Sequence, residues 1–236
     1  MVEGKNYKFS IIISLYNQLR YLPKLIESLE SQTFKDFSVE FCDDKSNDGT
    51  KEFFKRHTFN FPWQYHRLWL KRGMRLSKNL NQGIKKAKGE NCVFIMGDSF
   101  PEKNYLEVLN EYVGSINILC GIRVQVDGNR IVEMDWRLRK NIIPGEAVLL
   151  SESPYWKTTG NGLCVPTEAM KKYGGWNEKI QGYGGDDNEI VARLYHKGYL
   201  VWSVPQAILY HHWHIAKTET DRQRDYVRRL IQNYAK

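Results

Sequence analysis

Three acidic residues follow a run of glycines in the stretch GYGGDDNEI, residues 182–190. Acids in the first turn of a helix are common, because the positive end of the helix dipole attracts anions, so these acids could be structural. The same position suits a general base, since the dipole and the free backbone N–H groups keep a carboxylate ionised. The stretch by itself favours the structural interpretation, and the rest of the chain must decide.

Polar side chains also follow three short apolar runs that are typical of buried strands. Ser14 and Tyr16 end the first run, Asp44 follows the second, and Asp98 follows the third. A tyrosine and a carboxylate placed together could hold a nucleobase, by stacking on its face and by hydrogen bonds to its edge. Asp98 could bind Mg²⁺ or Mn²⁺ on a diphosphate, because both cations accept carboxylate oxygens as ligands.

These side chains meet only if the strands that carry them are neighbours. The first hundred residues alternate between strand and helix four times, which predicts a parallel sheet with right-handed crossovers. Ligands of such sheets bind beyond the carboxyl ends of the strands. The predicted strands are residues 9–17, 37–44, 63–70 and 91–96, and the predicted helices are residues 21–32, 51–57 and 75–89.

The second half of the chain is more irregular. Asp127-Gly128 predicts a hairpin within residues 123–134, and three histidines, His211, His212 and His214, follow the last apolar run. Those histidines are either core or surface residues or metal ligands. The other predicted elements are strands at 162–165, 200–204 and 207–210, helices at 167–176 and 182–198, and a basic amphipathic helix at about 220–234.

Composition and charge narrow the function classes. Lys and Arg outnumber Asp and Glu by 35 to 27, which gives a net charge of +8 and favours an anionic partner. The basic residues form no block, so nucleic acid is not the expected partner. The four cysteines lack metal-ligand spacing and suit buried free thiols in a reducing compartment. No long apolar stretch or secretory signal is visible, so we expect a cytoplasmic location, with peripheral membrane contact through the basic helix as an option.

Five motifs occur in order along the chain: SIIISLYN, FCDDKSNDGT, RGMRLSKNLNQGIKKAKG, FIMGDSFPEKNYL and GYGGDDNEI. This set, from about Phe9 to His214, resembles a family 2 glycosyltransferase with the GT-A fold. The resemblance implies a single α/β domain with a Rossmann-like, mostly parallel central sheet flanked by helices and a smaller mixed acceptor-side half. It places a nucleotide-sugar-binding half at about 9–100, an acceptor and catalytic half at about 101–215, and a basic C-terminal helix at about 216–236.

The resemblance further implies an inverting transfer of a sugar from a nucleotide-sugar, expected to be a UDP-sugar, to a hydroxyl of a saccharide or lipid-linked acceptor. The enzyme would be a hexosyltransferase or N-acetylhexosaminyltransferase of polysaccharide biosynthesis. Carried over by position, Ser14 and Tyr16 would contact the nucleoside, Asp44 would bind the uracil edge, and Arg75 would lie near the nucleotide.

The metal site and the base are also implied by position. Asp98 would close the family's D-x-D motif and bind a divalent metal, Mn²⁺ or Mg²⁺, although Met96 replaces the other aspartate. Relatives complete this site with a histidine, and the H-x-W-H pattern makes His211 or His214 the ligand. Asp187, with Asp186 before it, would be the general base, which takes the acceptor proton as the hydroxyl attacks C1 opposite the departing diphosphate.

Other functions stay open beside this one. A catalytically inactive nucleotide- or carbohydrate-binding module is one alternative, because Met96 removes one acid from the metal motif. A sugar nucleotidyltransferase has a related fold but expects a glycine-rich loop after the first strand, and residues 14–22 contain no glycine. Trp136, Arg137 and Trp156 are either acceptor contacts or core and rim residues.

Overall fold

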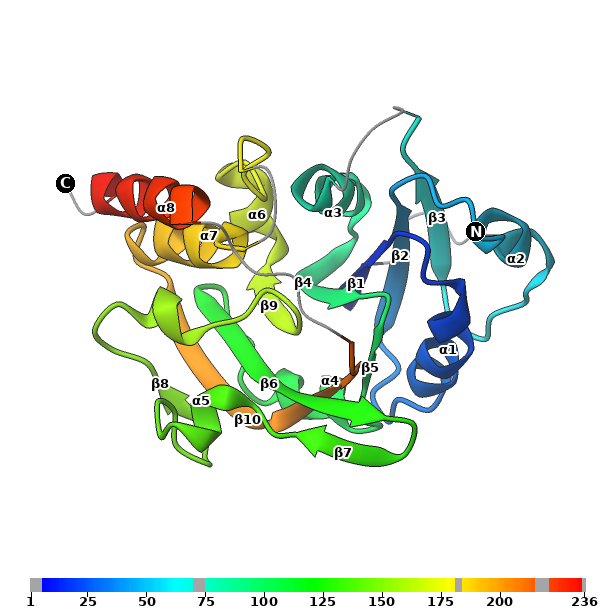
Figure 1. The fold of residues 1–236 in the computed structure, drawn as a ribbon, viewed down its shortest axis with the longest axis horizontal. Coiled ribbons are helices and arrows are strands. Elements are labelled where there is room, and N and C mark those ends of the chain that lie inside the picture. Colours follow the sequence, from blue (N-terminus) through cyan, green and yellow to red (C-terminus); the bar gives the residue numbers. More distant parts are fainter. Residues whose placement is uncertain (1–5, 70–74, 181–183, 215–220, 235–236) are drawn as a thin grey trace.

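The computed structural model describes residues 6–69, 75–180, 184–214 and 221–234 (Figure 1). Its strands are β1 (Tyr7–Leu15), β2 (Phe37–Asp43), β3 (Trp63–Arg67), β4 (Gly89–Met96), β5 (Ser99–Pro101), β6 (Asn117–Asp127), β7 (Arg130–Glu133), β8 (Val148–Leu149), β9 (Leu163–Pro166) and β10 (Leu200–His212). They form one sheet in the order β3-β2-β1-β4-β9-β6-β10-β5, with β7 beside β6 and β8 beside β10.

The parallel half of the sheet matches the sequence prediction. β1 lies between β2 and β4, β2 also pairs with β3, and all three pairings are parallel. The connecting helices are α1 (Leu22–Glu30), α2 (Thr50–Arg56) and α3 (Leu76–Lys86). The carboxyl ends of β1, β2 and β4 therefore meet at one edge, as expected.

Both faces of this sheet are buried, because successive side chains of a strand point to opposite faces. Ile11 and Ile13 of β1 pack in a cluster with α1 and with Phe54 of α2. Ile12, between them, packs on the other face with Leu80 of α3. All three isoleucines are fully buried, which explains why this strand is a continuous apolar run rather than an alternating one.

The second half of the sheet is mixed. β9 runs antiparallel to both β4 and β6, and β6 runs parallel to β10. The predicted hairpin is confirmed as β6 and β7, joined at Asp127-Gly128. The prediction of two separate strands at 200–204 and 207–210 was wrong, since β10 runs through both with a register shift between Ser203 and Ile208. Pro205 has no N–H to give to the ladder, so the pairing is interrupted while the strand continues.

The helices of the second half are α4 (Tyr105–Asn110), α5 (Trp136–Arg139), α6 (Thr167–Lys172), α7 (Asp186–Tyr195) and α8 (Asp221–Tyr234), with short 3-10 turns η1 (Leu19–Tyr21) and η2 (Pro154–Lys157). These helices do not form one group, since α6, α7 and α8 lie together whereas α4 lies behind the middle of the sheet (Figure 1). The predicted start of the last helix, residue 220, lies outside the described residues. Within the described chain, no helix has the length and apolar character needed to cross a membrane.

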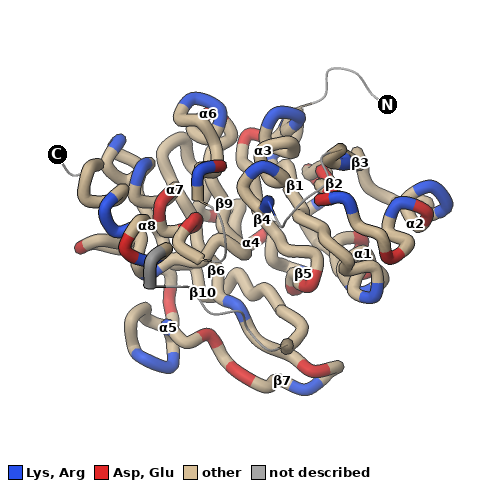
Figure 2. Tube along the Cα trace, turned by 45° about the horizontal axis from the view of Figure 1, so that its top comes forward, with Lys and Arg blue, Asp and Glu red and all other residues tan. Residues whose placement is uncertain are grey.

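Charge and thiol placement agree with the sequence. Basic and acidic residues are interspersed over the molecule rather than gathered in one block (Figure 2). Cys42, Cys92, Cys120 and Cys164 are all buried and free. Burial raises the pKa of Cys42 and Cys164, so these thiols stay protonated and serve as core residues. The architecture as a whole is the expected single α/β domain with a mostly parallel half and a mixed half.

Candidate active site

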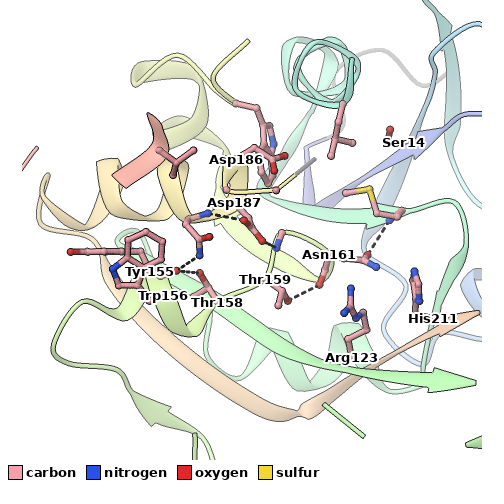
Figure 3. Close-up of a pocket in the computed structure, with 18 of the residues that line it drawn as sticks. Ser14, Arg123, Tyr155, Trp156, Thr158, Thr159, Asn161, Asp186, Asp187 and His211 are labelled. Carbon is pink, nitrogen blue, oxygen red and sulfur yellow. Dashed lines mark hydrogen bonds between the residues drawn. The ribbon is translucent and has the colours of Figure 1, made fainter. Parts of the chain in front are cut away.

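A cavity of about 1210 Å³ opens at the carboxyl ends of the parallel strands and extends to α7 and α8 (Figure 3). Ligand pockets usually measure about 300–1,000 Å³, so this cavity has room for more than one ordinary ligand. Most of the side chains that the sequence singled out line this cavity. They are Ser14, Tyr16, Asp44, Met96, Asp98, Trp136, Trp156, Asp186, Asp187, His211 and His214.

Asp44 lines one end of the cavity, and Arg75, which does not line it, pairs with Asp44 from behind. The Arg75 backbone N–H donates to Asp44 Oδ2 at 2.8 Å, and its guanidinium Nη2 donates to Oδ1 at 2.7 Å. Asp44 is buried and Arg75 partly exposed, so the ion pair lies at the rim and holds the start of α3 against the end of β2. Each carboxylate oxygen keeps a further lone pair for a ligand.

Ser14 and Tyr16 lie beside this pair at the end of β1. Ser14 Oγ accepts a hydrogen bond from Asn79 Nδ2 at 3.0 Å, and the same amide nitrogen donates to the Cys42 carbonyl at 2.6 Å. Asn79 thus joins the ends of β1 and β2 from inside α3. Tyr16 is 47% exposed at the cavity wall, where its ring face is available to a ligand rather than used in packing.

The adjacent loop FCDDKSNDGT contains turn residues as well as a site residue. Asp43 accepts hydrogen bonds from the backbone N–H and the hydroxyl of Ser46 at 2.8 and 2.6 Å. Asp48 likewise accepts from the backbone N–H and hydroxyl of Thr50 at 3.2 and 2.6 Å. These are local turn bonds, so Asp43 and Asp48 stabilise the turn, whereas Asp44 between them lines the cavity.

Asp98, His211 and His214 converge in the middle of the cavity. One potential ligand atom from each lies within 4.8 Å of the others. Asp98 Oδ1 is 3.5 Å from His211 Nε2, and Oδ2 is 3.3 Å from His214 Nε2. Asp98 does not cap the following helix, because α4 begins only at Tyr105 after Asn104.

The chemistry of this cluster fits a divalent metal. His211 Nδ1 is 2.7 Å from Gln125 Oε1, so Nδ1 carries the proton and Nε2 keeps its lone pair toward Asp98. Burial lowers the pKa of His211 to about 4 despite the opposing charge of Asp98, which keeps the ring neutral as a ligand must be. Asp98 Oδ1 is buried and has no hydrogen-bond partner in the described structure. A ligand set of one carboxylate and two imidazoles suits Mn²⁺ at least as well as Mg²⁺.

Strand geometry separates the three histidines. His211 and His212 are neighbours on β10 and therefore point to opposite faces. His212 stacks on Tyr21 with ring centroids 4.6 Å apart, away from the metal cluster. Met96, at the replaced position of the D-x-D motif, lines the cavity, and its backbone N–H donates to Asn161 Oδ1 at 3.0 Å.

Asp186 and Asp187 lie at the other end of the cavity, in the first turn of α7. Gly185 precedes them with a φ of 82°, a conformation that glycine adopts without strain. Asp187 Oδ2 accepts from the Gly160 N–H at 2.9 Å, and Oδ1 accepts from the Asn188 N–H at 2.9 Å. Asp187 is thereby held in one orientation against the loop that leads into β9 (Figure 3).

The helix N-terminus does not dominate the charge state of this acidic pair. Burial and, to a smaller extent, the charge of Asp187 raise the pKa of Asp186 to about 7. Burial also raises the pKa of Asp187, although its N–H partners act in the opposite direction. The expectation that the helix dipole and the free N–H groups keep the acids ionised therefore misses the larger effect, which is desolvation. A carboxyl group with a pKa near neutrality can both take and release a proton at working pH.

Glu189, the third acid of the opening stretch, has a structural role. It is fully buried and pairs with Arg193 at 3.0 Å within α7. It also accepts a hydrogen bond from Tyr234 of α8, and Arg193 donates onward to the carbonyls of Tyr173 and Gly175. The first-turn interpretation thus applies to one acid of the three.

Sequence reasoning missed Arg123, which lies between the metal cluster and the acids. It lines the cavity from β6, and its positive charge lowers the pKa of both Asp187 and His211. Its side chain points into the cavity beside His211 (Figure 3). The signal in the sequence is weak but present: Arg123 and Gln125 are polar residues two positions apart in an apolar strand, so they share one face.

The three residues left open as acceptor contacts separate in the structure. Trp136 and Trp156 line the cavity, and Trp156 is 41% exposed. Arg137 is fully buried and makes its hydrogen bonds to Asp135 and to other groups of the interior, so it touches no acceptor.

Comparison with known proteins identifies the family. The sequence model described as "Glycosyl transferase family 2" matches residues 10–165. The chain belongs to glycosyl transferase family 2. A second model, described as "N-terminal domain of galactosyltransferase", matches residues 148–215. The predicted family and enzyme class, a glycosyltransferase, are confirmed at this level.

Individual relatives agree with this assignment. The cholesterol galactosyltransferase of Borreliella burgdorferi is 31% identical over 103 residues, which cover 44% of this chain and 28% of that protein. The putative glycosyltransferase EpsE of Bacillus subtilis is 24% identical over 209 residues, which cover 85% of this chain and 71% of that one. This chain therefore spans less than a third of the first relative.

Solved structures show the same fold. S. aureus TarS 1-349 in complex with UDP superposes with a TM-score of 0.75 at 20% identity, covering 96% of this chain and 65% of that one. GalNAc-T7 with UDP, GalNAc and Mn²⁺ has a TM-score of 0.70 at 15% identity, covering 95% and 48%. The predicted GT-A fold is confirmed.

Proposed function

We propose that this protein transfers a sugar from a nucleotide-sugar to a hydroxyl of a saccharide or lipid-linked acceptor, with inversion at the anomeric carbon. One observation carries the proposal. A single cavity holds a nucleoside-type end at Asp44, a metal-type cluster at Asp98, and a carboxylate pair at the far end. This is the order of groups that a nucleotide-sugar and an acceptor hydroxyl would need.

The donor would lie along the strand ends, so that residues 9–100 supply most of its nucleotide contacts and residues 101–215 most of the acceptor contacts. Asp44 would accept from the N–H groups of the base edge while Arg75 holds its carboxylate in place. Tyr16 would lie against the ring face, and Ser14 would contact the nucleoside. UDP is the expected nucleotide, and the UDP bound in the TarS and GalNAc-T7 structures supports that choice.

The diphosphate would lie over Asp98, His211 and His214, which would hold Mn²⁺ or Mg²⁺. A bound cation would supply charge neutralisation for the departing diphosphate. Arg123, which makes no side-chain hydrogen bond to the described residues, would donate to the same oxygens from the side nearer the acids. With two histidines beside Asp98, the absence of an acid at position 96 leaves three protein ligands in place.

Asp187 would act as the general base. The N–H groups of Gly160 and Asn188 fix its carboxylate, and each oxygen keeps a lone pair for the proton of the acceptor hydroxyl. Its raised pKa makes it a better proton acceptor than an ordinary aspartate. A base on the acceptor side, opposite the leaving diphosphate, corresponds to a single displacement and hence to inversion. Asp186 would be the neighbouring acid of the pair and would keep its proton up to about pH 7.

The first test is thermal unfolding with UDP or GDP, each with and without Mn²⁺, for the wild type and for Asp98→Asn. A ligand at a hundredfold excess over its dissociation constant stabilises the folded protein by about 2.7 kcal/mol. For a chain of this size, this raises the melting temperature by roughly 5–11 °C. We expect UDP with Mn²⁺ to stabilise the wild type and the effect to vanish in Asp98→Asn. No response to any nucleotide would reject the donor site.

The second test separates enzyme from binding module. With a panel of UDP-sugars and acceptors, Asp187→Asn should lose about 10²–10⁴ in kcat while keeping the UDP response. Asp186→Asn, the matched change one residue away, should lose less. The reverse order would move the base to Asp186. UDP binding by the wild type without turnover on any pair would favour the inactive module instead.

A further inference from the structure

Helix α8 brings two arginines to the acceptor end of the cavity. Arg224 and Arg228 are one helical turn apart, so they share a face, and both line the cavity together with Val227, Ile231 and Gln232. Both arginines are exposed. The basic positions along this helix are visible in Figure 2. Arg229, the next residue, is also exposed but does not line the cavity.

The helix that carries these arginines is fixed to the catalytic end. Gln223 Nε2 donates to the Gly184 carbonyl at 2.7 Å, next to the glycine that starts α7. Val227 and Ile231 are buried in the core, and the Tyr234 hydroxyl donates to buried Glu189. The arginine side chains are therefore mounted on a rigid support, which lowers the entropy cost of binding a ligand there.

Aromatic rings from the η2 region line the cavity beside α7, and Trp136 of α5 lines it as well. The η2 rings are Tyr155 and Trp156, which Figure 3 shows together at that side. The apolar C–H face of a sugar ring packs on an aromatic face, and the polar groups of Thr158 and Asn188 lie on the cavity wall nearby. Aromatic and cationic side chains in one subsite suit a saccharide with a negative charge.

We infer that this end of the cavity binds an acceptor saccharide that carries an anionic group, a phosphate or a carboxylate, held by Arg224 and Arg228. The inference rests on the proposed function, which puts the donor at the other end. Arginine pairs with both anions through two parallel hydrogen bonds. Among the described residues, the Arg228 guanidinium pairs with exposed Asp225 at 3.7 Å, and such a surface pair is too weak to compete with a bound anion.

The acids of α7 decide where the charge on the acceptor lies. Asp186 and Asp187 would repel an anion next to the reacting hydroxyl. The anionic group therefore sits away from that hydroxyl, beyond the acids and toward α8. The site would therefore select an acceptor whose anionic group lies at a distance from the reacting hydroxyl. No charged group of the acceptor would lie next to that hydroxyl.

The test compares matched saccharides by titration calorimetry with UDP and Mn²⁺ present. Hyaluronan tetrasaccharide carries carboxylates where N-acetylated chitotetraose is neutral, and maltose 1-phosphate carries a phosphate that maltose lacks. We expect at least one charged member to bind about tenfold or more tightly than its neutral partner. The preference should fall in high salt, because exposed charges are screened. It should disappear in Arg224→Gln/Arg228→Gln and persist in Arg229→Gln, the control.

The outcomes separate this inference from the proposed function. Equal binding of charged and neutral members, or equal loss of the preference in Arg229→Gln, would overturn it. Phosphatidylglycerol vesicles that bind the wild type but not the double variant, with no saccharide preference, would also overturn it and make α8 a membrane contact. Loss of the UDP response with the saccharide preference intact would count against the donor site and leave the anionic subsite standing.

Discussion

The buried pair of Asp135 and Arg137 offers the sharpest test of how the fold supports the site. Arg137 is fully buried, and its guanidinium donates to both Asp135 oxygens at 2.9 and 2.6 Å. It also donates to the Gly121 and Lys157 carbonyls at 2.7 and 3.1 Å and to Cys120 Sγ at 3.0 Å. Burial alone would raise the pKa of Asp135, but the hydrogen bonds and charge of Arg137 outweigh it and lower that pKa.

We predict that Arg137→Met destabilises the protein by about 3–5 kcal/mol, the usual cost of removing one partner from a buried ion pair. Asp135 would keep only the backbone N–H groups of Arg123 and residue 137, and two interior carbonyls would lose a donor. For a chain of this length the change corresponds to a melting temperature lower by roughly 6–20 °C. Activity should fall as well, because Lys157 begins the segment that leads to Gly160 and its bond to Asp187.

Urea unfolding followed by circular dichroism would measure the loss. Arg139→Met is the matched control on the same short helix, because Arg139 is half exposed and pairs with Glu133 at the surface, so it should cost about 1 kcal/mol or less. Asp135→Asn combined with Arg137→Met should recover part of the loss by removing the uncompensated charge. An Arg137→Met protein as stable as the Arg139→Met control would refute the reasoning.

Two further predictions follow from burial and close packing. Because the folded Asp186 carboxyl keeps its proton up to about pH 7, whereas the unfolded one releases it near pH 4, this group should lower stability as the pH rises through that window. Urea unfolding at pH 5 and pH 8 would measure the free energy of unfolding of Asp186→Asn and of the wild type. The variant should gain about 1 kcal/mol or more relative to the wild type between pH 5 and pH 8. The same difference between the two proteins at both pH values would contradict the raised pKa. Gly83→Ala should destabilise by about 1–2 kcal/mol despite a better helix propensity, because its methyl would lie 2.6 Å from Ile12 Cγ2 and 2.9 Å from Cys42 Sγ. Gly145→Ala, whose methyl would meet no atom within 4 Å, is the control, and equal melting temperatures for the two variants would count against the packing argument.

Much of the first half could be predicted from the sequence because its signals are local. Apolar runs of the right length, helical spacing and turn residues lie within a few positions of one another, and right-handed crossovers then leave few ways to assemble them. Asp44 and Asp98 follow directly, since a residue just after a parallel strand must lie at the binding edge. The hairpin at Asp127-Gly128 is an equally local signal.

The second half depended on contacts between residues far apart in sequence. No local pattern distinguishes Arg137, which is buried, from Arg139, two residues on, which is exposed, because the difference lies in which distant groups surround each one. Nor does the sequence show that α8 lies over the cavity, since its docking depends on the bond from Tyr234 to Glu189 across 45 residues.

The sequence by itself determined which side chains could do chemistry and the parallel sheet edge that collects the first of them, because strand period and turn chemistry act over a few residues. The tertiary structure alone decided that His211 and His214 both lie beside Asp98 and that Arg123 lies between the metal cluster and the acids. It also decided that burial, more than the helix dipole, sets the pKa of the α7 acids. Desolvation depends on everything packed around a group, and that sum exists only once the chain has folded.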